Sequence, residues 1–397
     1  MHPVLLFAGF FIISMAHNLL GPLIPNIMGS TDMTLADSGL LMSFQQIGSV
    51  IAIILSLSFF KHKKQPSVLK IGYLFFILSL GAVVLISGKA LLYLLYIVIG
   101  FGIFLIDSSS NAIISSEYFE KRTTYLPLLH FFFSMGAIAT GYIILPFKGP
   151  QWRWAYGITA ALMALTAIAG ISWCARHKKN NKAQGVTSPE PAKVPSITPM
   201  LKDPAYVLYA VLFTFYNGSL GLLANWIPVY VELELLQSPT LVGASLTSFW
   251  VGIAIARLSN GPILHKGLDP LKLSTAGLIL SGISLNMAMN THSVTAFFIL
   301  IILCGFFSGA VIPMFLVVTP AWYPKNTAFI SLSYILTGTA GRMLFPWLAG
   351  YLASRSSLKS TLNMSSSLFY IGAALVIAVQ VLLYKRKRTT SASSTEK

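Results

Sequence analysis

The stretch LLYLLYIVIGFGIFLIDSSSNAIISSEY, residues 91–118, decides the fold class of this chain. Its apolar residues follow one another without amphipathic spacing, and the first charged side chain, Asp107, comes after sixteen uncharged residues. A helix of about 20 residues crosses the ~30 Å hydrocarbon core of a bilayer, because each residue adds 1.5 Å. The stretch therefore predicts a membrane-spanning helix that carries one acid inside the bilayer.

Similar apolar blocks fill the rest of the chain. Of its 397 residues, 55% are hydrophobic and 10% are charged, and the mean hydropathy is +0.74, whereas a soluble domain has roughly a quarter of its residues charged. We expect an all-α integral membrane protein with twelve transmembrane helices in two six-helix bundles. The predicted spans are Pro3–Ile27, Ser38–Phe60, Val68–Gly88, Leu91–Tyr118, Leu126–Phe147, Arg153–Ala175, Ala205–Val231, Leu241–Leu264, Leu271–Met289, Val294–Tyr323, Ala328–Leu352 and Leu362–Tyr384.

The positions of the basic residues predict how these helices are oriented. Of the 27 Lys and Arg residues, 21 fall on one side of the predicted membrane and five on the other, with Arg342 inside a span. Basic residues concentrate on the cytoplasmic side of membrane proteins. Both termini are therefore expected in the cytoplasm of a cell that carries the protein in its inner or plasma membrane. The net charge of +16 is interpreted as this topology signal and not as a nucleic-acid site.

One long polar stretch divides the chain into two halves. We predict an N-terminal six-helix bundle over residues 1–178, a cytoplasmic linker over 179–201, and a C-terminal six-helix bundle with a basic tail over 202–397. Matches at an offset of about 204 residues indicate that the halves are parallel repeats. The matching positions are Ile24–Pro25 with Ile227–Pro228, Gly39 and Gly48 with Gly243 and Gly252, and Tyr118–Thr123 with Trp322–Thr327.

With this span count, central loop and repeat, nearly the whole chain resembles the major facilitator superfamily. The resemblance implies a monomer that works by alternating access, with its substrate site between the halves near the membrane midplane. Within the superfamily, the chain resembles the fucose/glucose-type branch of sugar–proton symporters. It differs from that branch at two places where the branch carries acids and this chain has His17–Asn18 and Ser219. The segments similar to that branch are Gly100–Gly102 with Asp107, Asn111, Arg122, Leu129–His130 and Gly136; Tyr216–Gly218 with Asn225–Trp226 and Tyr230; and Phe249–Trp250 with Ala256–Arg257.

Three ionisable residues are candidates for proton coupling, because a charge at the bilayer centre costs about 2.5–3.5 kcal/mol on insertion scales. Burial favours the protonated form of Asp107 and a nearby cation favours its charged form, so Asp107 can gain and lose a proton as access alternates. The alternative is a permanent pair that only joins helices. Arg342 either pairs with Asp107, binds an anionic substrate or satisfies carbonyl groups within its own half. His130 is the third candidate, against the plainer alternative of a hydrogen-bonded packing residue.

A second group of polar and aromatic side chains inside the spans forms the candidate substrate site. Asn111 lies one helical turn after Asp107 on the same face, and an amide beside a carboxylate suits a solute with hydroxyl groups. Tryptophan rings can stack on a sugar, although interfacial anchoring is the common role of membrane tryptophans. The candidate substrate-binding residues are Asn111, His17, Asn18, Tyr216, Asn217, Asn225, Trp226, Trp250 and Gln45.

These features predict a secondary active transporter, with a proton symporter of a small polar solute such as a monosaccharide as the first interpretation. The alternative is a proton-driven antiporter that exports an amphiphilic compound, since the 26 Phe and 13 Met residues could line an apolar cavity. We expect no enzyme activity, metal or cofactor, because the sequence has no nucleophile–base pair, metal-ligand spacing or phosphate-binding glycine loop. The expected partners are the solute, protons and bilayer lipids.

Overall fold

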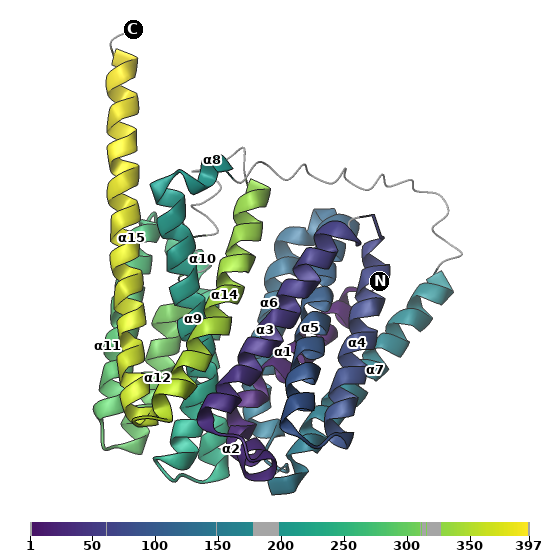
Figure 1. Cartoon of the computed structure of the whole chain (residues 1–397). Helices are drawn as coiled ribbons and strands as arrows, with labels where there is room; N and C mark the ends of the chain where they lie inside the picture. Colours follow the sequence, from purple (N-terminus) through teal and green to yellow (C-terminus); the bar gives the residue numbers. More distant parts are fainter. Residues whose placement is uncertain are drawn as a thin grey trace. The chain divides into compact units, whose positions relative to one another are not determined.

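The structure, a computed structural model, describes residues 2–60, 62–147, 149–177, 198–309, 311, 315 and 327–395. It is all-helical over these residues (Figure 1). The elements are α1 (Pro3–Asn18), α2 (Leu20–Thr31), α3 (Leu35–Ser58), α4 (Gln65–Leu85), α5 (Lys89–Glu117), η1 (Phe119–Lys121), α6 (Arg122–Ile143), η2 (Gly149–Gln151), α7 (Trp152–His177), α8 (Thr198–Leu201), α9 (Pro204–Leu233), α10 (Pro239–His265), α11 (Pro270–Asn290), α12 (Val294–Gly309), α14 (Thr327–Ala353) and α15 (Leu358–Thr395).

The twelve predicted spans correspond to these helices, which confirms the predicted fold class. By length and hydropathy, nine helices within the described residues can each cross a membrane, and the bent pair α1 and α2 makes up to ten. Helix α12 is apolar but shorter, and α14 matches the eleventh predicted span. The described residues leave out most of the predicted linker and the residues from Trp322 to Asn326 of the repeat.

The first predicted span differs from a straight helix. It bends by 45° between α1 and α2, at Leu19. Pro22 follows three residues later, and its nitrogen has no hydrogen to donate to the carbonyl of Asn18, so the helical ladder is interrupted at this level. The bend therefore arises from the proline of the Gly21–Pro22 pair.

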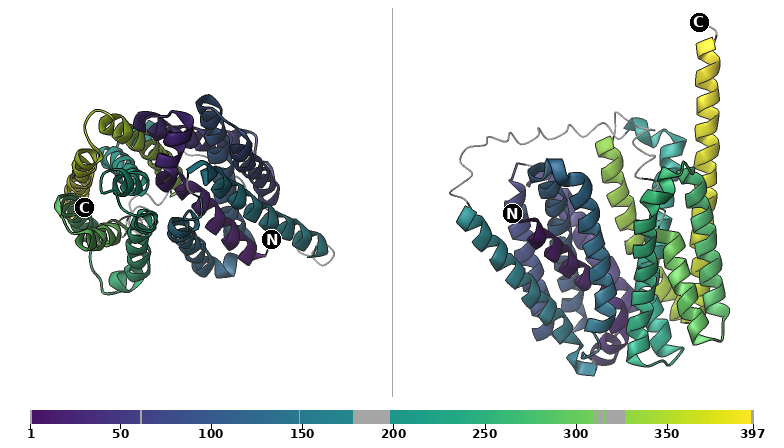
Figure 2. Two further views of the ribbon diagram at one scale, coloured as in Figure 1. Left: turned by 90° about the horizontal axis from the view of Figure 1, so that it is seen from below. Right: turned by 180° about the vertical axis from the view of Figure 1, so that it is seen from behind.

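The chain folds into two compact units, and each is described by itself. Unit 1 comprises 1–192, 224–247 and 346–358, so it contains α1 to α7 together with the end of α9, the start of α10 and the end of α14. Unit 2 comprises 193–223, 248–345 and 359–397. In unit 1, α5 packs against both α3 and α4, and α1 packs against α6. Figure 2 shows the unit 1 helices, purple to blue, side by side in both views.

Repeated glycines set the closest helix packing in both units. A Cβ on Gly48 of α3 would overlap the Ile97 carbonyl of α5, and one on Gly100 would overlap the Gln45 carbonyl. In unit 2, Gly252 of α10 and Gly305 of α12 are held against the Ile302 and Phe249 carbonyls in the same way. Small residues let membrane helices approach backbone to backbone. The internal repeat predicted from the sequence therefore recurs as a repeated contact.

Candidate solute-transport site

The candidate coupling acid lies in a polar stripe on α5. Asn111 donates one hydrogen bond to the Asp107 carboxylate and another to its carbonyl, each at 3.0 Å. Ser108 and Ser115 continue the same face, since positions three, four and seven apart align on a helix, and all four side chains are partly exposed. Sequence reasoning thus placed Asp107 and Asn111 together correctly. The pair offers a carboxylate oriented by an amide, which can accept hydrogen bonds or a proton.

The two candidate histidines lie on α1 and α6, which pack against each other. The rings of His17 and Phe133 are 6.3 Å apart, and those of His130 and Phe10 are 5.9 Å apart. His130 is exposed and His17 is partly buried. Asn18 is buried and donates to the Ser14 carbonyl at 2.8 Å, so its amide closes a local turn.

Gln45 is a further buried polar group of unit 1. Its side chain is 2% exposed, and its amide oxygen has no hydrogen-bond partner. Buried amide oxygens are almost always paired in folded proteins, so this one marks a place where a polar partner would be stabilised.

In unit 2 the intramembrane arginine is held by a candidate substrate residue. Arg342 of α14 donates to the Asn217 side-chain oxygen of α9 at 3.0 Å, and Asn217 donates in turn to the Phe213 carbonyl. A Cβ on Gly338 would lie 3.1 Å from the Asn217 side chain, so this glycine makes room for the amide. Asn217 therefore fixes one of the five donors of the guanidinium and joins α9 to α14 within unit 2.

Three aromatic candidates are buried in helix contacts. Tyr216 donates to the Ser308 carbonyl at 2.8 Å within unit 2. In unit 1, Trp226 is 1% exposed and its indole donates to the Pro346 carbonyl at 2.9 Å. Trp250 is 8% exposed and lies against Phe249, and Asn225 is 4% exposed. In this conformation the Tyr216 and Trp226 side chains join helices, and all three rings are buried.

Glycine contacts close one end of unit 1, and sequence reasoning missed their partners. Gly141 of α6 and Gly243 of α10 meet backbone to backbone. A Cβ on Gly21 of α2 would lie 2.8 Å from the Ala224 carbonyl of α9, and a Cβ on Gly39 of α3 would lie 2.9 Å from the Trp347 Cα of α14. Such contacts leave no space for a solute between the helices. Gly39 and Gly243 match each other in the sequence repeat, and this match was the only signal in the sequence that could have indicated these contacts.

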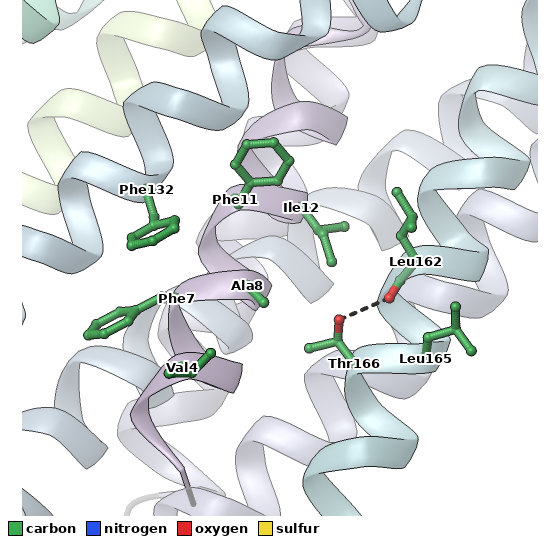
Figure 3. Close-up of a pocket in the computed structure, with 9 residues that line it drawn as sticks. All are labelled: Val4, Phe7, Ala8, Phe11, Ile12, Phe132, Leu162, Leu165 and Thr166. Atoms are coloured by element: carbon green, nitrogen blue, oxygen red, sulfur yellow. Dashed lines mark hydrogen bonds between the residues drawn. The ribbon is translucent and has the colours of Figure 1, made fainter.

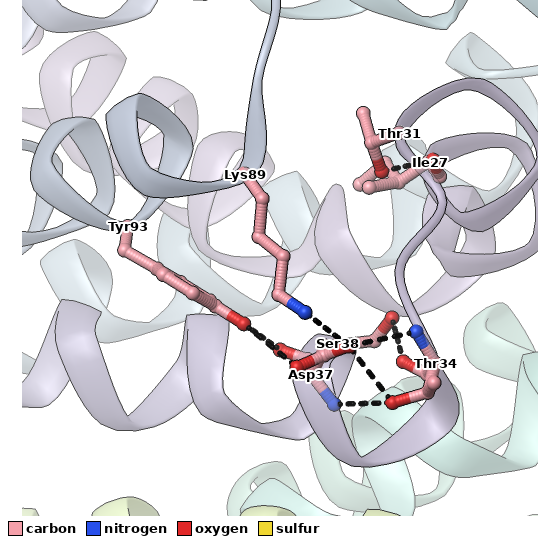
Figure 4. A network of polar contacts seen from close by, with 7 residues as sticks. All are labelled: Ile27, Thr31, Thr34, Asp37, Ser38, Lys89 and Tyr93. Atoms are coloured by element: carbon pink, nitrogen blue, oxygen red, sulfur yellow. Dashed lines mark hydrogen bonds and ion pairs between the residues drawn. The ribbon is translucent and has the colours of Figure 1, made fainter.

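A polar network holds the start of α3 to the start of α5 (Figure 4), and its acid was not singled out from the sequence. Asp37 accepts from the Thr34 backbone at 3.0 Å and the Thr34 hydroxyl accepts from the Asp37 backbone at 3.1 Å, which is a capping box. Lys89 lies 2.6 Å from the same carboxylate, and the Tyr93 hydroxyl donates to it at 3.3 Å. The Thr-x-x-Asp spacing was the signal that could have revealed the cap.

Comparison with solved structures relates the chain to transporters. A bacterial homologue of the human lysosomal transporter Spinster, in an inward-facing and occupied conformation, matches with a TM-score of 0.78 at 12% identity, over 95% of this chain and 96% of that one. The nucleoside transporter NupG matches with a TM-score of 0.71 at 12% identity, over 94% and 98%. At such identities the likeness concerns the fold alone.

Sequence comparison agrees with the fold. An uncharacterized MFS-type transporter of Yersinia pestis is 25% identical over 379 residues, which cover 93% of this chain and 94% of that protein. The family model described as Major Facilitator Superfamily matches residues 6–237 and 233–397, which together span almost the whole chain. The chain therefore belongs to the Major Facilitator Superfamily of membrane transporters.

Proposed function

We propose that this transporter is a proton-coupled symporter of a small polar solute such as a monosaccharide. The observation that carries the proposal is the Asp107–Asn111 pair, a carboxylate and an amide on one partly exposed face of a membrane-spanning helix. An acid inside a membrane span is energetically costly, and such residues commonly mark ion or substrate pathways. The amide fixes the carboxylate, and both groups can hydrogen-bond to hydroxyl groups of a solute.

Coupling requires that the proton has different affinities for the two access states. Protonation of Asp107 removes a charge from the face of α5 and changes the hydrogen bond from Asn111. The fixed guanidinium of Arg342 supports the proposal as a second polar anchor, in the other half of the chain. His130 is an exposed secondary candidate for proton transfer.

The charge asymmetry of the sequence supports cytoplasmic termini, and we propose that with this orientation the glycine contacts of unit 1 lie on the outer side of the membrane. We propose that these contacts form the outer gate, which opens to admit the solute and closes again as the cycle proceeds. Trp226 and Asn225 lie at the gate, and Trp250 follows Gly243 by about two turns along α10. We propose that opening makes these side chains available to the solute. The functional unit is proposed to be a monomer.

The test measures proton uptake into proteoliposomes that contain a pH-sensitive dye. Sugars, sugar acids, amino acids and amphiphilic compounds are added outside, and wild type is compared with Asp107→Asn. The matched control is Asp32→Asn, which makes the same change at an exposed helix end where the backbone is left-handed and Asn is tolerated.

A sugar that acidifies the lumen with wild type and Asp32→Asn, but not with Asp107→Asn, is the expected result. Acidification that persists in Asp107→Asn would remove Asp107 from the mechanism. Proton release driven by an amphiphile, without uptake driven by any sugar, would replace symport with the antiport alternative.

A further inference from the structure

A groove with a cavity volume of about 440 Å³ lies between α1, α6 and α7 of unit 1 (Figure 3). Ala8 of α1 forms its floor because its side chain is short. Phe7 and Phe132 stack at 5.4 Å on one side, and Leu162 and Leu165 of α7 line the other. Val4 is 57% exposed and Leu165 is 65% exposed, so the groove is open along its length toward the surroundings of the helices.

The groove offers no polar group to a ligand. All but one of its lining residues are hydrocarbon side chains, and the exception, Thr166, donates its hydroxyl to the Leu162 carbonyl at 2.9 Å. The stacked pair Phe7–Phe132 and the edge contact of Phe7 with Tyr125 hold the aromatic wall in place. A hydrocarbon chain fits such a surface, whereas a sugar would lose its hydrogen bonds to water there.

The length and depth of the groove match one leaflet of a bilayer. Its α1 residues run from Val4 to Ile12, and eight residues of helix rise by about 12 Å. One leaflet of a ~30 Å hydrocarbon core is about 15 Å thick. Since the N-terminus is predicted to be cytoplasmic, the groove lies in the cytoplasmic leaflet.

A basic residue stands at the end of the same helix face that lines the groove. Arg122, Tyr125, Leu129 and Phe132 of α6 are three or four residues apart and therefore form one stripe. Arg122 is exposed, its guanidinium lies 4.1 Å from the centre of the Phe119 ring, and Lys121 beside it is exposed as well. Ten residues separate Arg122 from Phe132, which is about 15 Å along the helix, the same distance as from the membrane surface to the middle of the bilayer.

We propose that this groove is a binding site for an anionic phospholipid of the cytoplasmic leaflet. One acyl chain lies along Ala8 between the Phe7–Phe132 pair and Leu165, and the phosphate lies at Arg122 and Lys121. Basic groups at this depth attract anionic headgroups. The site is independent of the solute and of Asp107.

The experiment uses the full chain in nanodiscs that contain phosphatidylglycerol or phosphatidylcholine with a photoactivatable group in mid-chain, and maps the adducts by peptide mass spectrometry. We expect adducts in the segments Val4–Ile12 and Leu162–Thr166, about 25-fold more with phosphatidylglycerol, since each of the two basic side chains contributes about fivefold near an anionic surface. Arg122→Gln should lower this preference to about fivefold, because Lys121 remains, and should leave some labelling by both lipids.

Two variants fill the groove, so that misfolding of one does not decide the outcome. Ala8→Trp and Leu165→Trp should abolish groove adducts, whereas Ile168→Trp, at a 61% exposed position of α7 that does not line the groove, should leave them unchanged. Equal labelling by both lipids, or labelling unaffected by either filling variant, would each overturn the proposal. The comparison of the two lipids on wild type needs no variant.

Discussion

Gly243→Ala tests whether the glycine contacts of unit 1 act as a gate. A Cβ on Gly243 would overlap the carbonyl oxygen and carbon of Gly141, which belong to the backbone of α6. A flexible side chain could turn away, but a helix backbone can only move as a body. The substitution therefore forces α6 and α10 apart at this level, and a conformation in which they are already separated is not affected.

The size of the effect follows from this overlap. Forcing an extra methyl group into a close-packed contact costs about 1–3 kcal/mol. A bias of this size changes a two-state ratio by roughly 5- to 150-fold. The population of the closed conformation should fall by that factor relative to the open one, provided that the chain still folds.

Thiol accessibility measures the shift. Cys174 and Cys304 are first replaced by Ser, and Ala224→Cys then places one thiol at a position that is 8% exposed and lies against Gly21. A membrane-impermeant thiol reagent is added from outside. Gly243→Ala should raise the rate of modification at least about fivefold, the lower bound of the same bias.

The control is Gly81→Ala in α4, where an added Cβ would meet nothing within 4 Å. It should leave the rate at the value of the parent. A rate that stays within about twofold of the parent in folded Gly243→Ala would refute the reasoning, since a 1 kcal/mol bias already exceeds that factor.

Two further substitutions test contacts that hold unit 1 together. Asp37→Ala removes the capping box and the Lys89 ion pair at once, and thermal unfolding in detergent should show a loss of stability of about 1–2 kcal/mol. Lys89→Ala, at a 43% exposed side chain, removes only the ion pair and should cost less than about 1 kcal/mol. Equal losses would contradict the dominant role of the cap. Trp226→Phe keeps an aromatic ring but removes the indole hydrogen bond to the Pro346 carbonyl, and it should lower stability by about 1–3 kcal/mol. Unchanged stability, with faster labelling of the Ala224→Cys thiol, would instead indicate that the bond matters only for closing the gate.

The sequence was sufficient for the membrane fold because hydropathy is a property of consecutive residues. Each span had to cover about 30 Å of hydrocarbon, so the length of each apolar block limited its choice of structure. The same local reasoning joined Asp107 to Asn111, since four residues on a helix bring two side chains to one face. The bend near Gly21–Pro22 likewise has a local cause, because it depends on a proline within the same helix.

The tertiary structure decided which residues meet across the chain. Gly141 and Gly243 are about a hundred residues apart, and nothing within either segment specifies the other as its partner. For Trp226 the sequence left stacking on a solute and anchoring at the membrane interface equally open, and in this conformation the buried indole instead donates to the Pro346 carbonyl. The groove at Ala8 likewise depends on three helices at once. Burial and close approach are properties of several segments together, so only the assembled structure can determine them.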